Sequence, residues 1–239
     1  MSIDEQPADE EGQGQAGPDP ADIPGYHPPK QERSRRTLDR LVRETEEMLR
    51  SRTFEELSVD EIVERANSSK GAFYTRFDDK KALLEYLRRE RFQEVLEEWS
   101  SFLRPDRWED RPLAEFVEAF LARLFRIYRR SAGPMREFIR HTRIEPEPQV
   151  RDRGKTLNEH VVGGVLEVCR RHRDEITHPD PEQAVEVAIG FTGAIARERL
   201  LFTWPAVDDD GASDPDALEQ ELVRAFCRYL GIPRDGESR

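Results

Sequence analysis

The stretch from Phe54 to Phe77, FEELSVDEIVERANSSKGAFYTRF, decides the fold. Ser58 and Glu61 stand three residues apart before a short apolar pattern, which is the spacing of a capping box at a helix start. Asn67 interrupts that helix, because asparagine tolerates the left-handed conformation of a helix end. Either of the two serines that follow can cap a second helix, at about residues 69–76. Two short helices joined by so tight a turn predict a helix-turn-helix.

The second helix is expected to have an anchoring face and a reading face. Phe73 and Phe77 lie four residues apart, so they share the face that packs on the core. Gly71 weakens the helix, which makes sense if the backbone must come close to a partner such as DNA. For the charged residues the alternative interpretation is an ordinary solvated helix face. The candidates for DNA contact are Ser58, Ser69, Lys70, Gly71, Ala72, Tyr74, Thr75, Arg76 and Lys80.

Charge is unevenly distributed along the chain. The net charge of −12 does not by itself suggest a nucleic-acid partner, so that inference needs a local feature. Residues 1–29 contain acidic side chains, no Lys or Arg and few large apolar residues, and they are expected to form a disordered acidic tail. A basic cluster follows, which could reach a phosphate backbone or simply form a solvated helix start. Its members are Lys30, Arg33, Arg35, Arg36 and Arg40.

Residues 37–87 resemble the DNA-binding region of the TetR family of transcriptional regulators. The matching positions are Phe54, Ser58-Val59, Ile62, Ala66, Ser69-Lys70-Gly71, Phe73-Tyr74, Phe77, Lys80 and Leu83. Thr53 departs from the usual glycine, and Asn67-Ser68 replaces the usual glycine-valine of the turn, which could change the angle of the reading helix. The resemblance implies a dimeric, ligand-responsive regulator that reads a palindromic operator, usually as a repressor.

The rest of the chain is helical by its pattern. Apolar residues recur at three- and four-residue spacing, and no alternation of strand length stands out, so we predict an all-α fold. A three-helix DNA-binding domain is expected over residues 30–81, and a helical ligand-binding and dimerisation domain over 82–232. Residues 233–239 are expected to form a flexible tail. Helix boundaries are predicted near Asp79, Leu103, Pro112, Gly133-Pro134, Pro146 and Pro148, and at Gly231.

The helix at about residues 182–204 has two interpretations. It could be a central core helix, or its small residues could permit the close approach of a dimer seam. The resemblance implies the second, with a homodimer formed through helices at about 182–204 and 215–230. It also implies a small-molecule pocket whose ligand tilts the helix at 79–103. Amphipathicity alone suggests the pocket residues Phe116, Phe120, Phe138, Phe191 and Trp204.

The sequence gives little support for a disulfide, a metal site or catalytic residues. Cys169 and Cys227 lie in apolar helical patterns and are expected to be buried hydrophobes. The polar cluster at residues 172–180 fits an interhelical loop better than a metal site. We therefore expect no enzyme activity, cofactor or metal, and, without a signal peptide or membrane span, a cytoplasmic protein. The alternatives are a helical interaction protein that lost DNA binding, and a small-molecule enzyme or carrier.

Overall fold

A computed structural model describes residues 23–144, 148–202 and 215–233. Across these ranges the chain is helical, with short 3-10 turns at Pro105–Arg107 and Arg173–Glu175 and no named strand, which confirms the predicted all-α fold. The α-helices are α1 (Glu32–Met48), α2 (Val59–Arg65), α3 (Lys70–Tyr74), α4 (Lys80–Phe102), α5 (Leu113–Arg130), α6 (Ala132–Ile144), α7 (Pro148–Arg171), α8 (Pro181–Leu201) and α9 (Pro215–Leu230).

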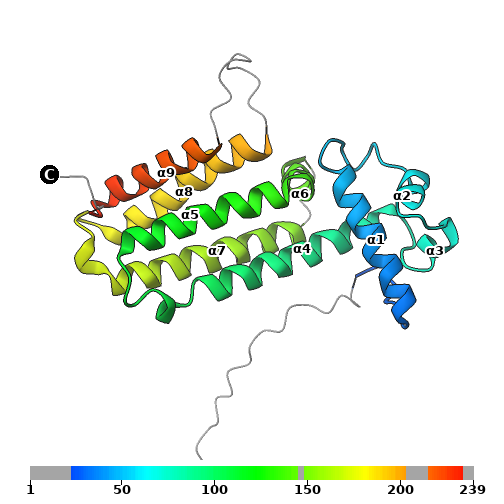
Figure 1. The fold of residues 1–239 in the computed structure, drawn as a ribbon, viewed down its shortest axis with the longest axis horizontal. Coiled ribbons are helices and arrows are strands. Elements are labelled where there is room, and N and C mark those ends of the chain that lie inside the picture. The colour runs from blue at the N-terminus through cyan, green and yellow to red at the C-terminus, as the bar shows by residue number, and fades with distance from the viewer. Residues whose placement is uncertain (1–22, 145–147, 203–214, 234–239) are drawn as a thin grey trace, which may run out of the picture.

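The molecule has a small head at one end of a long helical bundle (Figure 1). We call residues 23–87 the head, because one buried cluster joins α1, α2, α3 and the first turns of α4. The remaining part of α4 packs with α5, α7, α8 and α9 around a second buried cluster, and we call this part the bundle. Helix α4 therefore contributes Leu83 and Leu87 to one core, and Trp99 and Phe102 to the other. The buried cluster of the head extends to Leu87, whereas the sequence suggested a boundary at residue 81.

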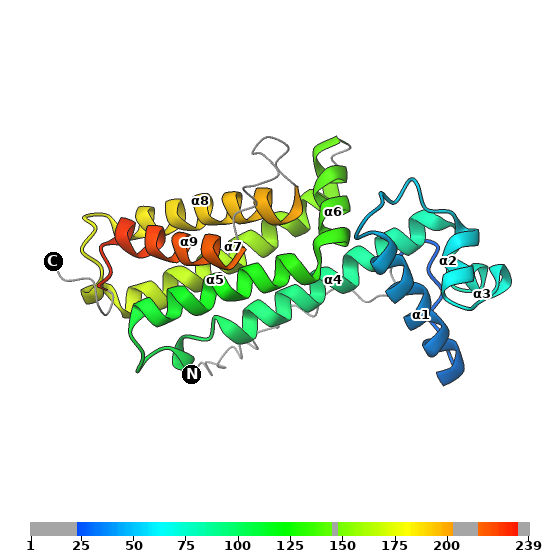
Figure 2. The same cartoon turned by 45° about the horizontal axis from the view of Figure 1, so that its top comes forward.

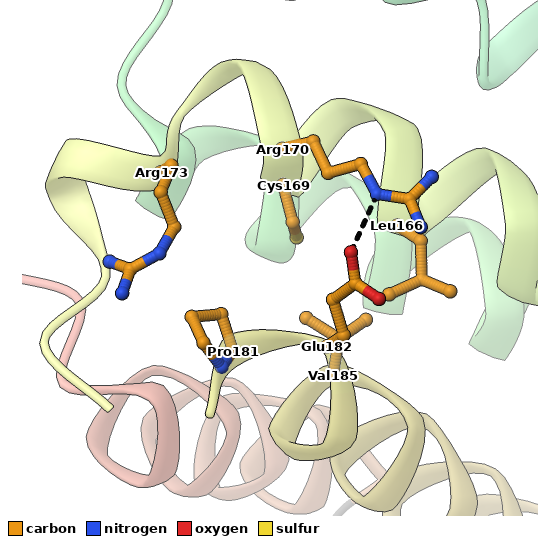
Figure 3. Close-up of a pocket in the computed structure, with 7 residues that line it drawn as sticks. All are labelled: Leu166, Cys169, Arg170, Arg173, Pro181, Glu182 and Val185. Carbon is orange, nitrogen blue, oxygen red and sulfur yellow. Dashed lines mark hydrogen bonds and ion pairs between the residues drawn. The ribbon is translucent and has the colours of Figure 1, made fainter. Parts of the chain in front are cut away.

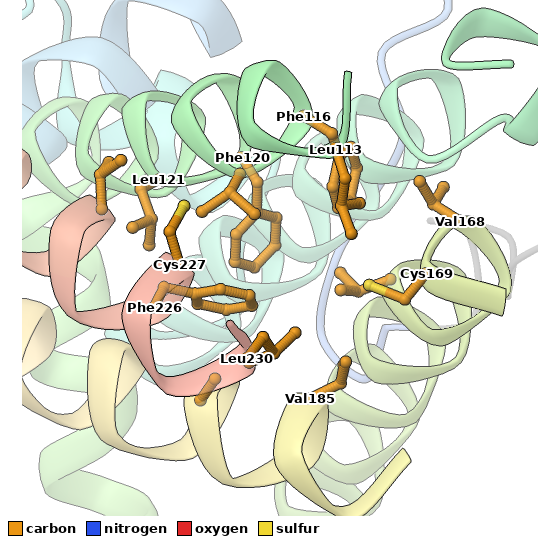
Figure 4. Packing of buried hydrophobic residues seen from close by; sticks show 14 of the residues in the cluster. Leu113, Phe116, Phe120, Leu121, Val168, Cys169, Val185, Phe226, Cys227 and Leu230 are labelled. Atoms are coloured by element: carbon orange, nitrogen blue, oxygen red, sulfur yellow. The ribbon is translucent and has the colours of Figure 1, made fainter. Parts of the chain in front are cut away.

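Aromatic and aliphatic side chains of α5 and α9 meet in the middle of the bundle (Figure 4). Phe120 is fully buried, with its ring centroid 5.2 Å from that of Trp99 and 6.4 Å from that of Phe226. Cys227 is buried beside this ring, as the apolar pattern predicts. Burial of such large side chains supplies the main driving force for folding, which leaves the polar faces available for function.

The expectation of a disordered tail up to residue 29 is wrong for its last residues. Ile23 is 2% exposed and Tyr26 is buried, with its ring centroid 4.6 Å from that of Tyr86. The backbone N–H of His27 donates to the carbonyl of Arg76 at 2.7 Å. Two large apolar side chains within a polar stretch are sufficient to pin this segment to the head. The other tail residues, 1–22, lie outside the described part of the chain, as do residues 234–239 of the predicted C-terminal tail.

The predicted helix boundaries are close to the observed ones. Helix α4 begins after its N-cap Asp79, and Pro112 is the N-cap of α5. The break expected at Gly133-Pro134 falls slightly earlier, because α5 ends at Arg130 and both residues lie in the first turn of α6, where proline is tolerated. Helix α8 is described as far as Leu201, and the predicted end at Trp204 lies outside the described residues.

Candidate DNA-binding surface and ligand cavity

Helix α2 begins with the capping box that the sequence predicts. The amide of Glu61 donates to Ser58 Oγ at 3.2 Å, and the amide of Ser58 donates to Glu61 Oε2 at 2.9 Å. Arg52 Nη1 also donates to Glu61 Oε1 at 2.8 Å. The hydrogen bond from Arg52, followed by those from Ser58, lowers the pKa of Glu61 to about 2. The cap therefore keeps its negative charge at neutral pH and fixes the first turn of α2.

The turn between α2 and α3 is made by Asn67. Its φ of 45° lies in the left-handed region, which confirms the role predicted for this asparagine. The amide of Ser68 donates to the carbonyl of Val63 at 2.8 Å, and Arg40 Nε donates to the carbonyl of Ala66 at 3.1 Å. These bonds satisfy carbonyls at the end of α2 that the helix itself leaves free. The turn thus sets the direction in which α3 leaves the head.

One face of helix α3 packs against the core of the head, and the opposite face is exposed. Phe73 and Phe77 are fully buried in the head, as the four-residue spacing predicts. Ser69 is the N-cap, and its Oγ accepts from the amide of Ala72 at 3.1 Å. The α-helix ends at Tyr74, which is shorter than the predicted 69–76, and Thr75 is its C-cap.

The upper side of α3 carries most of the predicted DNA contacts. We call this set of exposed residues the reading face: Ser69, Lys70, Gly71, Tyr74 and Thr75. Tyr74 is 51% exposed, although the edge of one ring meets the other where Tyr74 contacts Phe73, with the ring centroids 5.4 Å apart. Ala72 is half-buried beside the reading face, and Ser58 is exposed at the start of α2. Six of the nine predicted residues therefore lie on or beside the exposed side of α3, and Ser58 is exposed on the neighbouring helix.

Lys70 has a partner that a ligand would have to displace. Its Nζ lies 2.6 Å from Asp60 Oδ1, and both side chains are well exposed. This hydrogen bond raises the pKa of Lys70, so the ammonium remains charged at neutral pH. Exposed ion pairs contribute little to stability, and the side chain can exchange Asp60 for another anion at small cost.

The prediction that Arg76 belongs to the reading face is wrong. Arg76 is only 7% exposed, and its guanidinium donates to both the hydroxyl and the carbonyl of Ser34 in the first turns of α1. Its place in the sequence beside Thr75 suggested exposure, whereas the packing of α1 covers it. Arg76 joins α1 to the end of the reading helix.

Lys80 is also turned inward. Its ammonium donates to the carbonyls of Phe54, Glu55 and Leu57 at 2.8, 3.2 and 2.6 Å. The Nζ atom also lies 4.8 Å from the centroid of the Phe54 ring. An ammonium has three protons, and these three carbonyls accept all of them. The geometry therefore assigns Lys80 to holding the loop before α2, and the predicted phosphate contact has no free donor here.

A polar cleft of about 900 Å³ separates the start of α1 from the reading face. Arg33, Arg36 and Arg40 line the α1 side, and Ser69 and Thr75 line the opposite side. Arg33 and Arg36 are exposed, although Arg36 Nε lies 3.2 Å from Glu32 Oε1. Three of the five residues of the predicted basic cluster thus lie across the cleft from the reading face.

The bundle contains an open cavity of about 800 Å³ near the head. Phe120 and Phe138 line it, as the aromatic pattern suggested. Phe116 instead lies in the core, and Phe191 lies against Tyr229 with ring centroids 6.0 Å apart, so neither lines this cavity. Trp204 lies outside the described residues. Helical spacing alone could not show which of these aromatic side chains would face the same space.

Helix α6 links the cavity to the head, and no pattern in the sequence indicates this link. It stands across the end of the bundle beside α1 (Figure 2). Phe138 faces the cavity, whereas the buried carboxylate of Glu137 accepts from the amide of Phe54 at 3.2 Å. Arg136 donates to the carbonyl of Leu49 at 3.1 Å. Neighbouring side chains of one helix therefore touch both units.

Cys169 and His172 are both buried and have structural surroundings. Cys169 lines a crevice of about 300 Å³ between α7 and α8 (Figure 3), and burial raises the pKa of its thiol to about 12. His172 uses both ring nitrogens, at 2.8 Å from Glu175 Oε1 and 3.0 Å from the carbonyl of Trp108. Within the described ranges, His, Cys, Asp and Glu side chains form no group suited to a metal ion, and no helix could cross a bilayer.

Helices α8 and α9 lie side by side on the outside of the bundle (Figures 1 and 2). Exposed and half-buried apolar side chains lie along them. We call this set the outer apolar face: Val187, Ile195 and Tyr229, which are exposed, and Phe191, which is half-buried. Val187 is 44% exposed, and Ile195 and Tyr229 are each 40% exposed. Exposed apolar side chains gathered in one place mark an interaction surface.

The comparisons with known proteins agree with this geometry. Residues 41–87 match the family described as bacterial regulatory proteins of the tetR family, and residues 112–230 match the tetracyclin repressor-like C-terminal domain. The chain belongs to the TetR family of transcriptional regulators. The first match contains the capping box, the turn and the reading face, and the second contains most of the cavity lining and the outer apolar face. No curated protein matches the chain.

Solved structures of the TetR fold are similar in shape and distant in sequence. A protein from Mesorhizobium loti assigned to the family is 18% identical, with a TM-score of 0.60 over 83% of this chain and 98% of its own. A TetR-family regulator from Streptomyces coelicolor is 19% identical, with a TM-score of 0.59 over 82% and 81%. Salmonella enterica GusR is 16% identical, with a TM-score of 0.57 over 84% and 98%. At such identities the likeness concerns the fold.

Proposed function

We propose that this TetR-family protein is a ligand-responsive DNA-binding regulator, acting in the cytoplasm as a repressor and not as an enzyme. The observation that carries the proposal is the reading face, which holds polar side chains and a glycine in the open while Phe73 and Phe77 anchor the helix beneath. A short exposed helix of this kind fits the major groove. The proposed contacts are Ser58, Ser69, Lys70, Gly71, Ala72, Tyr74 and Thr75, with Arg76 and Lys80 as positioning residues.

The outer apolar face supports a homodimer through α8 and α9. One reading helix contacts few base pairs, so two copies related by a two-fold axis would read a palindromic operator with half-sites ~34–36 Å apart. A second copy of the chain would remove Val187, Ile195 and Tyr229 from water, which is favourable in proportion to the apolar area buried.

Ligand response would pass through α6 as well as α4. A small molecule in the cavity would press on Phe138, and α6 would pass the displacement to the loop before α2 through the bond between Glu137 and Phe54. Helix α4 spans both cores, so its tilt would move the head as a unit. The ligand would regulate binding only if its affinity differs between the two arrangements.

Gly71→Ala is expected to raise the stability of the protein and to lower its affinity for DNA. A Cβ at Gly71 would have only Ser69 Oγ within 4 Å, at 3.9 Å, so nothing in the protein requires a glycine there. Alanine should stabilise the helix by up to ~1 kcal/mol. The added methyl group would nevertheless meet a closely approaching DNA backbone. Urea denaturation and fluorescence anisotropy on labelled DNA should show a higher unfolding midpoint with weaker binding; unchanged affinity would remove Gly71 from the interface.

An interaction protein that lost DNA binding is the second candidate, favoured by the net charge of −12. Salt dependence distinguishes the two functions. A DNA-binding regulator should lose affinity with a slope of log K against log salt of about −0.9 for each phosphate neutralised. Anisotropy titrations of the dimer at increasing salt measure this slope, and absence of binding at low salt would favour the interaction protein.

A further inference from the structure

We infer that the bundle cavity binds an amphipathic carboxylate, with the anionic head on Arg197 and the apolar body among the aromatic walls. The inference rests on the proposed function, because it names the class of ligand for the same cavity. Neither the family match nor the related structures identify such a ligand for this chain.

The walls of the cavity suit an apolar body. Trp99 and Phe120 form one side with their ring centroids 5.2 Å apart, and Phe138 of α6 contributes from the end near the head. The volume of about 800 Å³ is within the range of cavities that enclose small organic ligands. Helix α8 adds a smooth wall where Gly190 and Gly193 leave space for a ligand, because a Cβ at either position would meet nothing within 4 Å.

Arg197 is the cation in this lining. It projects from the last turns of α8, and its Nε atom is buried without a hydrogen-bond partner. No described carboxylate lies within ion-pair distance of its guanidinium. Elsewhere in the bundle, arginines have such partners: Arg123 Nη1 lies 3.0 Å from Glu98 Oε1, and Arg153 Nη1 lies 2.7 Å from Glu85 Oε1. The Nε atom of Arg123 is likewise buried without a hydrogen-bond partner, so the missing carboxylate is what distinguishes Arg197. Arg197 is half-buried, and an anion that enters the cavity could satisfy its buried Nε atom and pair with its charge.

A carboxylate matches the guanidinium of Arg197 better than a neutral polar group does. The planar guanidinium can donate two parallel hydrogen bonds to the two carboxylate oxygens. Tyr128 lines the same cavity; burial raises its pKa and the nearby charge of Arg197 opposes that shift, so its hydroxyl stays protonated and can also donate. Glu159 and Glu186 line the cavity too, but both are exposed and neither pairs with Arg197. They mark the rim and disfavour a second anionic group there.

The test compares carboxylates with neutral molecules of the same body. Calorimetric titration of the full-length dimer would use decanoate against decanol, and 2-naphthoate against 2-naphthalenemethanol. At least one carboxylate should bind at least tenfold more tightly than its neutral counterpart. Arg197→Gln should remove this preference and leave the neutral affinity unchanged. Arg199→Gln, which makes the same charge change outside the cavity lining, should retain the preference.

Three outcomes would overturn the inference. The first is equal affinity for each carboxylate and its neutral counterpart in wild-type protein. The second is no binding of any probe by protein that unfolds cooperatively. The third is an Arg197→Gln protein that becomes monomeric with an unchanged carboxylate preference, since Arg197 would then serve the dimer contact. DNA anisotropy on the same samples separates the two proposals: an Arg197-dependent preference without DNA binding would support the ligand class and remove the regulator role.

Discussion

Lys80→Met should destabilise the head by about 2–3 kcal/mol, because it removes a charged donor from the carbonyls of Phe54, Glu55 and Leu57. Methionine keeps the length of the side chain and loses only the ammonium. The loop before α2 would lose its tie to α4, so the capping box and the reading helix would shift. We expect a lower unfolding midpoint in urea and weaker DNA binding in the folded protein.

Salt dependence shows whether Lys80 acts through position or through phosphate. A positioning residue should leave the salt slope of DNA binding unchanged, whereas a phosphate contact would reduce it by about 0.9 when removed. Lys81→Met is the matched control, since its side chain is exposed and the charge change is the same. Wild-type stability combined with a reduced slope for Lys80→Met would return Lys80 to the interface.

Gly133→Ala should disturb the contact between the bundle and the head. A Cβ at Gly133 would lie 2.6 Å from the carbonyl carbon and oxygen of Leu49 and 2.9 Å from the amide nitrogen of Arg50. Backbone atoms cannot rotate away as a side chain can, so α6 and the end of α1 must separate. Overpacking of this kind costs about 1–3 kcal/mol. We expect lower stability and altered DNA affinity, although α3 carries no change.

Gly163→Ala provides the control for the Gly133 experiment. It also lies in a helix, and a Cβ there would have nothing within 4 Å. Its stability should rise slightly or stay the same, because alanine favours the helix. Urea unfolding and DNA anisotropy of the two variants measure the difference. Wild-type stability and affinity for Gly133→Ala would show that the contact between α1 and α6 is not fixed.

The local features of the head could be predicted from the sequence, and the tertiary ones could not. Ser58 with Glu61, and Asn67 with its left-handed backbone, act through neighbours within a few residues. Arg76 was misjudged because the helix that buries it, α1, lies some forty residues earlier in the chain. Lys80 was misjudged because its acceptors are backbone carbonyls, which leave no mark in the side-chain pattern.

The ligand cavity was the least predictable part for the same reason. Its lining comes from α4, α5, α6, α7 and α8, and helical periodicity gives the inward face of each helix without its height along the bundle. Of the four suggested phenylalanines, Phe120 and Phe138 therefore line the cavity, whereas Phe116 and Phe191 do not. Arg197 gave no signal in the sequence, because a half-buried arginine without a carboxylate partner is recognised only when its surroundings are known.

The most direct test of the regulator role is selection of bound sequences from a random DNA pool with the purified protein at low salt, repeated with Lys70→Ala. Lys155→Ala makes the same charge change far from the head and serves as control. We expect a motif with two-fold symmetry from wild type and from Lys155→Ala, and we expect Lys70→Ala to lose or weaken it. No enrichment by folded wild-type protein, with or without the carboxylate probes, would contradict the regulator role.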